Sequence, residues 1–173
     1  MNRLEAMIAR LLTQRAALDA AARLVASLDG PVLEIGLGKG RTYSHLRGLF
    51  PDREIYAFDR DLHAPPDATP PEGRLRLGDF RETLAAMAED MAQGRIGVAA
   101  LAHADIGSED LAADAALARD IAGPVVALMA PGGLVLGDRA LSHPRLAEID
   151  APTAALPAGI APWRYFAYRV AEG

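Results

Sequence analysis

The sequence contains no cysteine among its 173 residues. Disulfide bonds, thiol catalysis and cysteine-ligated zinc are therefore excluded, and a secreted scaffold held together by disulfides is untenable. The N-terminal residues lack the charged start and apolar core of a signal peptide, and no apolar stretch is long enough to cross a bilayer. We therefore expect a cytoplasmic protein with no membrane partner.

Excess positive charge is also missing. Lys and Arg number 18 against 23 Asp and Glu, which gives a net charge of −5, and no basic cluster with interleaved aromatic residues occurs. Binding to a nucleic-acid backbone would lack its usual electrostatic source, so no nucleic-acid partner is expected. The chain is 51% hydrophobic and long enough for one core. We expect a single domain over residues 1–173 that acts on a small molecule.

The most informative stretch is residues 33–40, in which Glu34 stands two positions before a G-x-G-x-G run. An apolar segment that reads as a strand precedes Gly36, and a segment that reads as a helix follows Gly40. Glycine tolerates the unusual backbone angles of such a turn and lets a ligand approach the backbone closely. The pattern favours a nucleoside cofactor, although an ordinary glycine-rich turn between a strand and a helix is the simpler alternative.

Two further strands end in acidic residues. Residues 54–58 lead into Asp59, about twenty positions after the glycine loop, where a carboxylate can accept from both hydroxyls of a ribose. Residues 74–78 lead into Asp79 and Phe80. Asp is also a common helix N-cap, so Asp79 could cap the helix that we expect over residues 81–91.

These features resemble, in their order, the motifs of class I S-adenosylmethionine-dependent methyltransferases. The resemblance covers residues 31–138, includes the turn Pro131-Gly132-Gly133 before the fifth strand, and is strongest to a small bacterial group of undefined substrate. It implies an α/β fold with a doubly wound, Rossmann-like, mostly parallel sheet. It also implies S-adenosyl-L-methionine as cofactor, with the carboxylate of Glu34 attracting the ammonium group of its methionine arm.

In that family the residue after the third strand accepts from the adenine amino group, and an apolar neighbour covers the ring. Asp79 and Phe80 occupy these places, while Asp59 takes the ribose. The expected cofactor-binding residues are therefore Glu34, Gly36, Gly38, Gly40, Thr42, Tyr43, Asp59, Asp79 and Phe80.

The remaining segments complete the expected fold. Residues 96–104 form an almost continuous apolar run, which predicts a central fourth strand covered on both faces. A helix capped by Ser108 follows and is interrupted at Gly123-Pro124. Few residues then separate Asp138 from the last strand, residues 164–170, so the C-terminal antiparallel edge must be abbreviated.

Residues 2–28 predict a long N-terminal helix. Its apolar side is expected to contain Leu4, Ile8, Leu11, Leu18, Ala22 and Val25. This helix could pack on the sheet, cover the cofactor as a lid, or contact another subunit in a homo-oligomer.

The chemistry should lie at the carboxyl ends of the fourth and fifth strands. His103 could act as a base near neutral pH or be buried as a hydrogen-bonded core residue. Asp105 follows on the same side and is our first choice for a catalytic group facing the acceptor. Asp138 and Arg139 could form an ion pair or orient an acidic substrate. Asp105 with Asp138 also resembles the carboxylates with which metal-dependent catechol-type O-methyltransferases hold Mg²⁺ at the ends of these two strands. We nevertheless expect no metal, because the Arg139 guanidinium would repel one.

The sequence predicts methyl transfer to an oxygen or nitrogen atom of a small-molecule acceptor. One alternative is a module that binds the cofactor without turnover, since no base stands out and the C-terminal edge is short. The other is an NAD(P)-dependent oxidoreductase, with the same glycines and Asp59 and with Arg60 beside it. The spacing of the third glycine argues against that reading, because a dinucleotide fingerprint is G-x-G-x-x-G.

Overall fold

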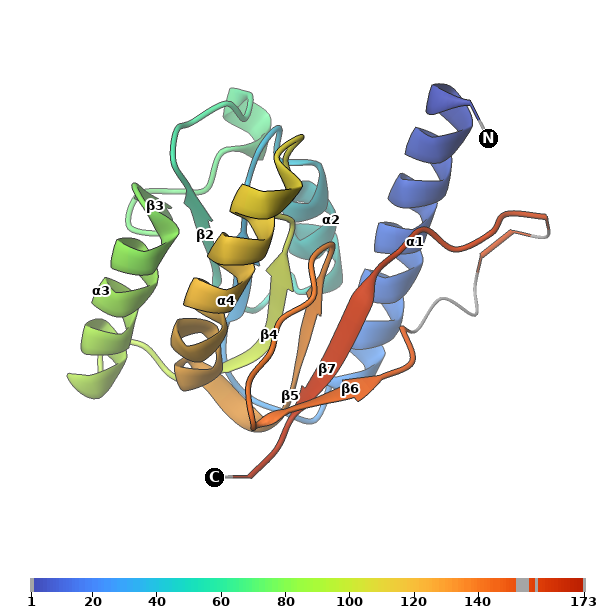
Figure 1. The fold of residues 1–173 in the computed structure, drawn as a ribbon. Coiled ribbons are helices and arrows are strands. Elements are labelled where there is room, and N and C mark those ends of the chain that lie inside the picture. The colour runs from blue at the N-terminus through green and yellow to red at the C-terminus, as the bar shows by residue number, and fades with distance from the viewer. Residues whose placement is uncertain (1, 152–155, 158, 173) are drawn as a thin grey trace.

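A seven-stranded mixed sheet forms the centre of the molecule in the computed structural model, which describes residues 2–151, 156–157 and 159–172 (Figure 1). The strands lie in the order β3-β2-β1-β4-β5-β7-β6. Their bounds are β1 Val32–Ile35, β2 Ile55–Asp59, β3 Leu75–Leu77, β4 Ala99–Ala104, β5 Met129–Gly137, β6 Leu146–Ile149 and β7 Phe166–Val170. The first five strands pair in parallel, and β7 pairs antiparallel with both β5 and β6. The predicted mostly parallel sheet with an antiparallel edge is therefore confirmed.

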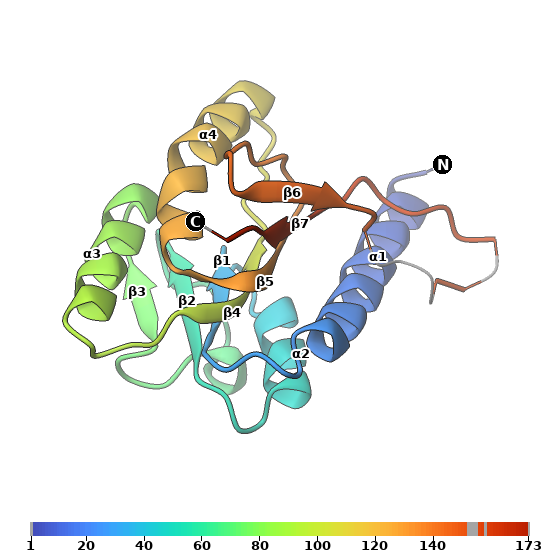
Figure 2. The same ribbon diagram turned by 90° about the horizontal axis from the view of Figure 1, so that it is seen from below.

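Helices cover both faces of the sheet. They are α1 Arg3–Leu24, α2 Arg41–Leu49, α3 Phe80–Ala92 and α4 Leu111–Ala127, and a short 3-10 helix, η1 Pro66–Ala68, lies in the proline-rich loop. Figure 2 shows α1 and α2 on one face and α3 and α4 on the other. No helix among the described residues combines the length and the apolar character that a membrane crossing requires.

Two apolar layers hold the helices to the sheet. Leu84 of α3 and Ile121 of α4 pack on Phe58 and its neighbours on one face. On the other face Leu18 of α1 and Leu46 of α2 pack against the strands. Every residue of β1 and β4 is buried, as expected for central strands that are covered on both sides.

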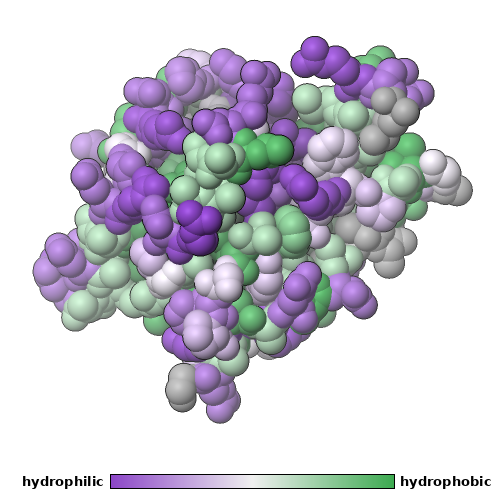
Figure 3. Space-filling view, viewed as in Figure 1, coloured by the Kyte–Doolittle hydropathy of each residue, from purple (hydrophilic) through white to green (hydrophobic). Residues whose placement is uncertain are grey.

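The apolar side predicted for the N-terminal helix is wrong in its first half. Leu4, Ile8 and Leu11 are 70%, 43% and 38% exposed, and Figure 3 shows green apolar side chains at the upper right, over the first turns of α1. The helix buries Thr13 and Gln14 instead, because both have hydrogen-bond partners. The Thr13 hydroxyl accepts from the backbone N–H of Trp163 at 2.9 Å, and Gln14 donates to Asp105 at 3.0 Å.

Three local predictions between residues 108 and 137 also need correction. The cap of α4 is Asp110, whose carboxylate accepts from two backbone N–H groups, and Ser108 lies outside the helix. Pro124 does not interrupt α4, because its missing N–H costs one hydrogen bond close to the helix end. The Pro-Gly-Gly turn lies inside β5, where the register with β4 shifts between Ala99 and Leu101.

Candidate functional site

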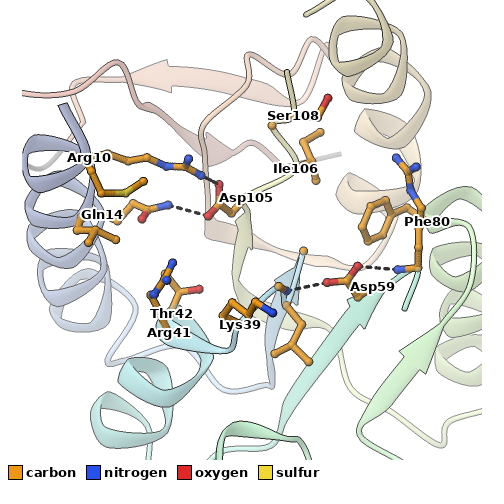
Figure 4. Close-up of a pocket in the computed structure, with 17 residues that line it drawn as sticks. Arg10, Gln14, Lys39, Arg41, Thr42, Asp59, Phe80, Asp105, Ile106 and Ser108 are labelled. Atoms are coloured by element: carbon orange, nitrogen blue, oxygen red, sulfur yellow. Dashed lines mark hydrogen bonds and ion pairs between the residues drawn. The ribbon is translucent and has the colours of Figure 1, made fainter. Parts of the chain in front are cut away.

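A cavity of about 480 Å³ opens at the carboxyl ends of the parallel strands (Figure 4). It lies where the order of strands reverses, between β1 and β4, which is the usual ligand position in open α/β sheets. The glycine loop and the first turn of α2 form one wall, and the ends of β2 and β4 with the loops after them form another. The third wall is α1, through Met7, Arg10, Leu11 and Gln14.

The three loop glycines are needed for different reasons. All have positive φ, at +94° for Gly36, +51° for Gly38 and +72° for Gly40. A Cβ on Gly36 would stand 2.1 Å from the carbonyl oxygen of Asp105, and one on Gly40 would stand 2.7 Å from the Cβ of Ala68. A Cβ on Gly38 would meet no atom within 4 Å. Gly36 and Gly40 thus allow close packing of the protein itself, whereas a side chain at Gly38 would extend into the open cavity.

Asp59 anchors this loop. Its carboxylate accepts from the backbone N–H of Gly38 at 2.7 Å and from that of Arg60 at 2.7 Å. The side chain lies at the end of β2 and lines the cavity, with Phe80 nearby at the start of α3 (Figure 4). One carboxylate therefore sets the loop position and still faces the space where a ligand would lie.

Glu34 and His103 form a buried ion pair beneath the loop. They are register partners on β1 and β4, both side chains are 0% exposed, and His103 Nδ1 lies 2.7 Å from a carboxylate oxygen of Glu34. The hydroxyl of Thr42 donates to the other oxygen. Burial by itself would lower the pKa of His103, but the charge and hydrogen bond of Glu34, with help from Asp105 and Asp138, outweigh burial and raise it.

Neither member of this pair lines the cavity. The structure places His103 in the core position that we considered for it, and Glu34 supports the loop from below. Next to the pair lies Tyr165, whose ring centre is 6.1 Å from that of His103.

Asp105 lines the cavity at the end near α1. The Arg10 guanidinium donates to one of its carboxylate oxygens at 2.5 Å, and the Gln14 amide donates to the other at 3.0 Å. Figure 4 shows these two α1 side chains reaching Asp105 across the cavity. The carboxylate is thus held in a fixed orientation by a helix that is distant in sequence.

Asp138 and Arg139 form the ion pair that we considered from the sequence. The guanidinium donates to Asp138 at 2.9 Å and to Asp114 of α4 at 2.7 Å. Asp138 also accepts from the backbone N–H groups of Ile106 and Gly107, each at 3.1 Å. Burial and the charge of Asp105 raise the pKa of Asp138, although Arg139 acts in the opposite direction. This network ties the loop after β4 to the end of β5 and lies beside the cavity rather than in it.

Asp79 caps α3 by accepting from the backbone N–H of Arg81 at 2.8 Å. It lies in a second cavity of about 460 Å³, which shares Arg60 with the first. Hydrogen bonds from the backbone and side chain of Arg81 lower the pKa of Asp79, so the carboxylate is charged at neutral pH.

Tyr43 is buried in the core and borders a separate cavity beyond α2.

The structure brings together six of the predicted residues in the first cavity: Gly36, Gly38, Thr42, Asp59, Phe80 and Asp105. Sequence reasoning considered the N-terminal helix as a lid but did not identify its cavity-lining residues, above all Arg10 and Gln14, and it gave no role to Lys39 within the motif. Lys39 carried a signal, because it is the only lysine among the 18 basic residues. Nothing in the sequence connects Arg10 with Asp105, 95 positions later.

The comparisons with known proteins agree on one family and one fold. A family described as S-adenosyl-L-methionine methyltransferase matches residues 1–170. A crystal structure of an S-adenosyl-L-methionine methyl transferase from Silicibacter pomeroyi DSS-3 is 42% identical, covers 98% of this chain and 99% of that chain, and has a TM-score of 0.83. Human methyltransferase-like protein 13 in complex with SAH is 14% identical over 94% of this chain and 81% of that chain, with a TM-score of 0.58, and shares the fold alone. No curated protein sequence matches significantly.

Proposed function

Because the chain belongs to the family of S-adenosyl-L-methionine methyltransferases, we propose that it methylates an oxygen or nitrogen atom of a small-molecule acceptor. The observation that carries the proposal is the single cavity that runs from Asp59 at one end to Asp105 and α1 at the other. One end has the groups that a nucleoside needs, and the other has a fixed carboxylate beside apolar side chains.

The residues at the first end fit the family's cofactor, S-adenosyl-L-methionine. Gly38 leaves the loop backbone open toward the cavity, since a Cβ there would meet no protein atom within 4 Å. We assign Asp59 to the ribose hydroxyls, Phe80 to the face of the adenine, and Asp79 in the adjoining cavity to the adenine amino group. Glu34 and Thr42 would act on the loop from below, by fixing the backbone that the methionine arm contacts.

When bound, the cofactor supplies a methyl group that its sulfonium already activates. The protein therefore has to align an acceptor with that group, and a proton has to be removed only when the acceptor carries one. We assign acceptor orientation to Asp105, whose position is fixed by Arg10 and Gln14. Met7 and Leu11 would contact apolar parts of the acceptor, because both line the same end.

A small-molecule acceptor is supported by the net charge of the chain, −5, and by the position of Asp105 inside a cavity of about 480 Å³. The cytoplasmic location, the single domain and a homo-oligomer remain predictions from the sequence. Family membership favours turnover over passive binding, and it disfavours the nicotinamide alternative.

Asp59 provides a test of the cofactor end. We expect Asp59→Ala to weaken binding of S-adenosylhomocysteine about ten- to a hundredfold, because a hydrogen bond to a charged group contributes roughly 1.5–3 kcal/mol. Asp59→Asn should weaken binding less, since its amide oxygen can still accept from the N–H of Gly38. Calorimetry measures both, with Asp52→Ala at an exposed turn as the control. Unchanged affinity in a folded Asp59→Ala variant would exclude the ribose role.

Asp105 provides the test of the acceptor end. Wild-type protein with methyl-labelled cofactor should label at least one compound in a library of small hydroxylated and amino metabolites. With that acceptor, Asp105→Asn is expected to lower the single-turnover rate about a hundredfold, because general-base or positioning groups supply effects of this size. Affinity for S-adenosylhomocysteine should stay near the wild-type value.

Asp110→Asn is the matched control, because Asp110 is an acidic residue of the same loop region that caps α4 outside the cavity. A wild-type rate in Asp105→Asn would make Asp105 structural. Added EDTA should leave the wild-type rate unchanged. Inhibition by EDTA would instead indicate that Asp105 and Asp138 bind a metal ion together, and the proposed positioning role would be wrong.

A further inference from the structure

Four basic side chains line the main cavity, although the chain as a whole is acidic. They are Arg10, Lys39, Arg41 and Arg60. Arg10 is paired with Asp105 at 2.5 Å and lies 4.0 Å from Asp138. In the part of the chain that the structure describes, the other three form no ion pair. Cations that face a cavity without a carboxylate partner are available to an anionic group of a ligand.

Lys39 is the one of these cations that lies inside the glycine loop. It stands between Gly38 and Gly40, and both neighbours are fixed by hydrogen bonds. The Gly38 N–H donates to Asp59 at 2.7 Å, and the Gly40 N–H donates to the carbonyl of Leu37 at 2.8 Å. Figure 4 shows the Lys39 side chain between Thr42 and Asp59. The ammonium group therefore belongs to the same loop that forms the wall of the cavity.

The residue type is also informative. All the other 17 basic residues are Arg, which leaves Lys39 as the one compact ammonium group in the chain. An ammonium offers three donors on a flexible stem and fits beside a ligand where a planar guanidinium would need more room. A position between two glycines next to a ligand suits that smaller head group.

The family's cofactor has one anionic group, the carboxylate of its methionine arm. We propose that Lys39 binds this carboxylate, an inference that rests on the identity of the cofactor. A charge-assisted hydrogen bond from an ammonium to a carboxylate is among the stronger polar contacts in proteins. Lys39 then distinguishes ligands that carry the amino-acid arm from shorter nucleosides that lack it.

The other cations of the cavity are less suited to this task. Arg10 already compensates Asp105 and Asp138, and its withdrawal would leave both carboxylates without that charge. Arg60 follows Asp59 at the end of the cavity assigned to the nucleoside. Its positive charge contributes to lowering the pKa of Asp79. Arg41 begins α2 and is exposed like Lys39, but it carries the larger, planar guanidinium and stands outside the pair of glycines.

A comparison of two ligands distinguishes the contact between Lys39 and the carboxylate from the other contacts of the cofactor. S-adenosylhomocysteine contains the amino-acid arm, and 5′-methylthioadenosine has the same nucleoside and thioether without it. We expect Lys39→Met to weaken S-adenosylhomocysteine about ten- to a hundredfold and to leave the affinity of methylthioadenosine within about twofold. Lys39→Arg should recover part of the loss, and Arg119→Met, at an exposed residue of α4 outside the cavity, should change neither ligand more than about threefold. Calorimetry at fixed ionic strength provides all the affinities.

Equal weakening of both ligands by Lys39→Met would overturn the proposal, because Lys39 would then act on the loop as a whole. Selective loss of S-adenosylhomocysteine in Arg41→Met or Arg10→Met, with Lys39→Met unaffected, would assign the carboxylate to that arginine instead. If the wild-type protein bound neither ligand, the cofactor assignment itself would fail. If the wild type bound both ligands and Lys39→Met changed neither affinity, the cofactor assignment would stand and the proposed role of Lys39 would be wrong.

Discussion

Replacement of Glu34 by alanine is expected to lower the free energy of unfolding by about 3–5 kcal/mol, the cost of removing one partner from a buried ion pair. Glu34 and His103 are both 0% exposed, and their closest polar atoms are 2.7 Å apart. After the substitution, the His103 imidazole keeps its burial but loses the carboxylate that stabilises its charge. Thr42 also loses its acceptor.

The chain offers a matched control in Glu54, which pairs with Arg74 but has a side chain that is 53% exposed. Exposed ion pairs contribute about 0–1 kcal/mol, so Glu54→Ala should have little effect. Denaturant unfolding followed by circular dichroism measures both variants. Equal, small losses in the two variants would mean that the Glu34–His103 pair contributes no more than a surface pair.

The same pair gives stability a defined dependence on pH. The pKa of His103 is raised in the folded protein, so the folded state binds the proton more tightly than the unfolded chain does. The stabilisation is fully present below the unfolded pKa of about 6.5 and is lost as pH rises through the folded pKa. His103→Gln should be less stable in acid and should lack this decline above neutral pH.

The order of strands and helices could be predicted from the sequence because each element has a local signal. Apolar runs of four to six residues mark the buried strands, and glycines or capping carboxylates mark the turns. The resemblance of residues 31–138 to a methyltransferase is confirmed by the family match over residues 1–170. Asp59 could be placed in the cavity because it ends a parallel strand, and ligands in open α/β sheets bind beside the carboxyl ends of such strands.

The contacts of Glu34 could not be predicted, because they depend on the register between β1 and β4. Family resemblance suggested an interaction with the ligand's ammonium, whereas the register sets Glu34 opposite His103 and α2 brings Thr42 above it. The buried side of α1 could not be predicted from the sequence either. Apolar periodicity favoured Leu4, Ile8 and Leu11, but partners from distant segments hold Thr13 and Gln14 inside.

Gly38→Val is expected to abolish measurable binding of S-adenosylhomocysteine while the protein stays folded. Gly38 has a φ of +51°, and a Cβ at this position would point into space free of protein atoms within 4 Å. Two effects then act together. A β-branched residue strains the left-handed backbone by roughly 1–2 kcal/mol, and its methyl groups occupy the wall of the cavity that the cofactor would contact.

Gly94 separates these two effects. It has a φ of +70°, and a Cβ on it would also meet no atom within 4 Å, but it follows α3 and does not line the cavity. Gly94→Val should therefore lose a similar amount of stability and keep wild-type affinity for S-adenosylhomocysteine. Gly36 is unsuitable for this comparison, because its Cβ would stand 2.1 Å from the Asp105 carbonyl and the fold itself would suffer. If Gly38→Val bound S-adenosylhomocysteine as tightly as Gly94→Val, the cofactor could not lie against this loop, and the roles assigned to Asp59 and Lys39 would fall with it.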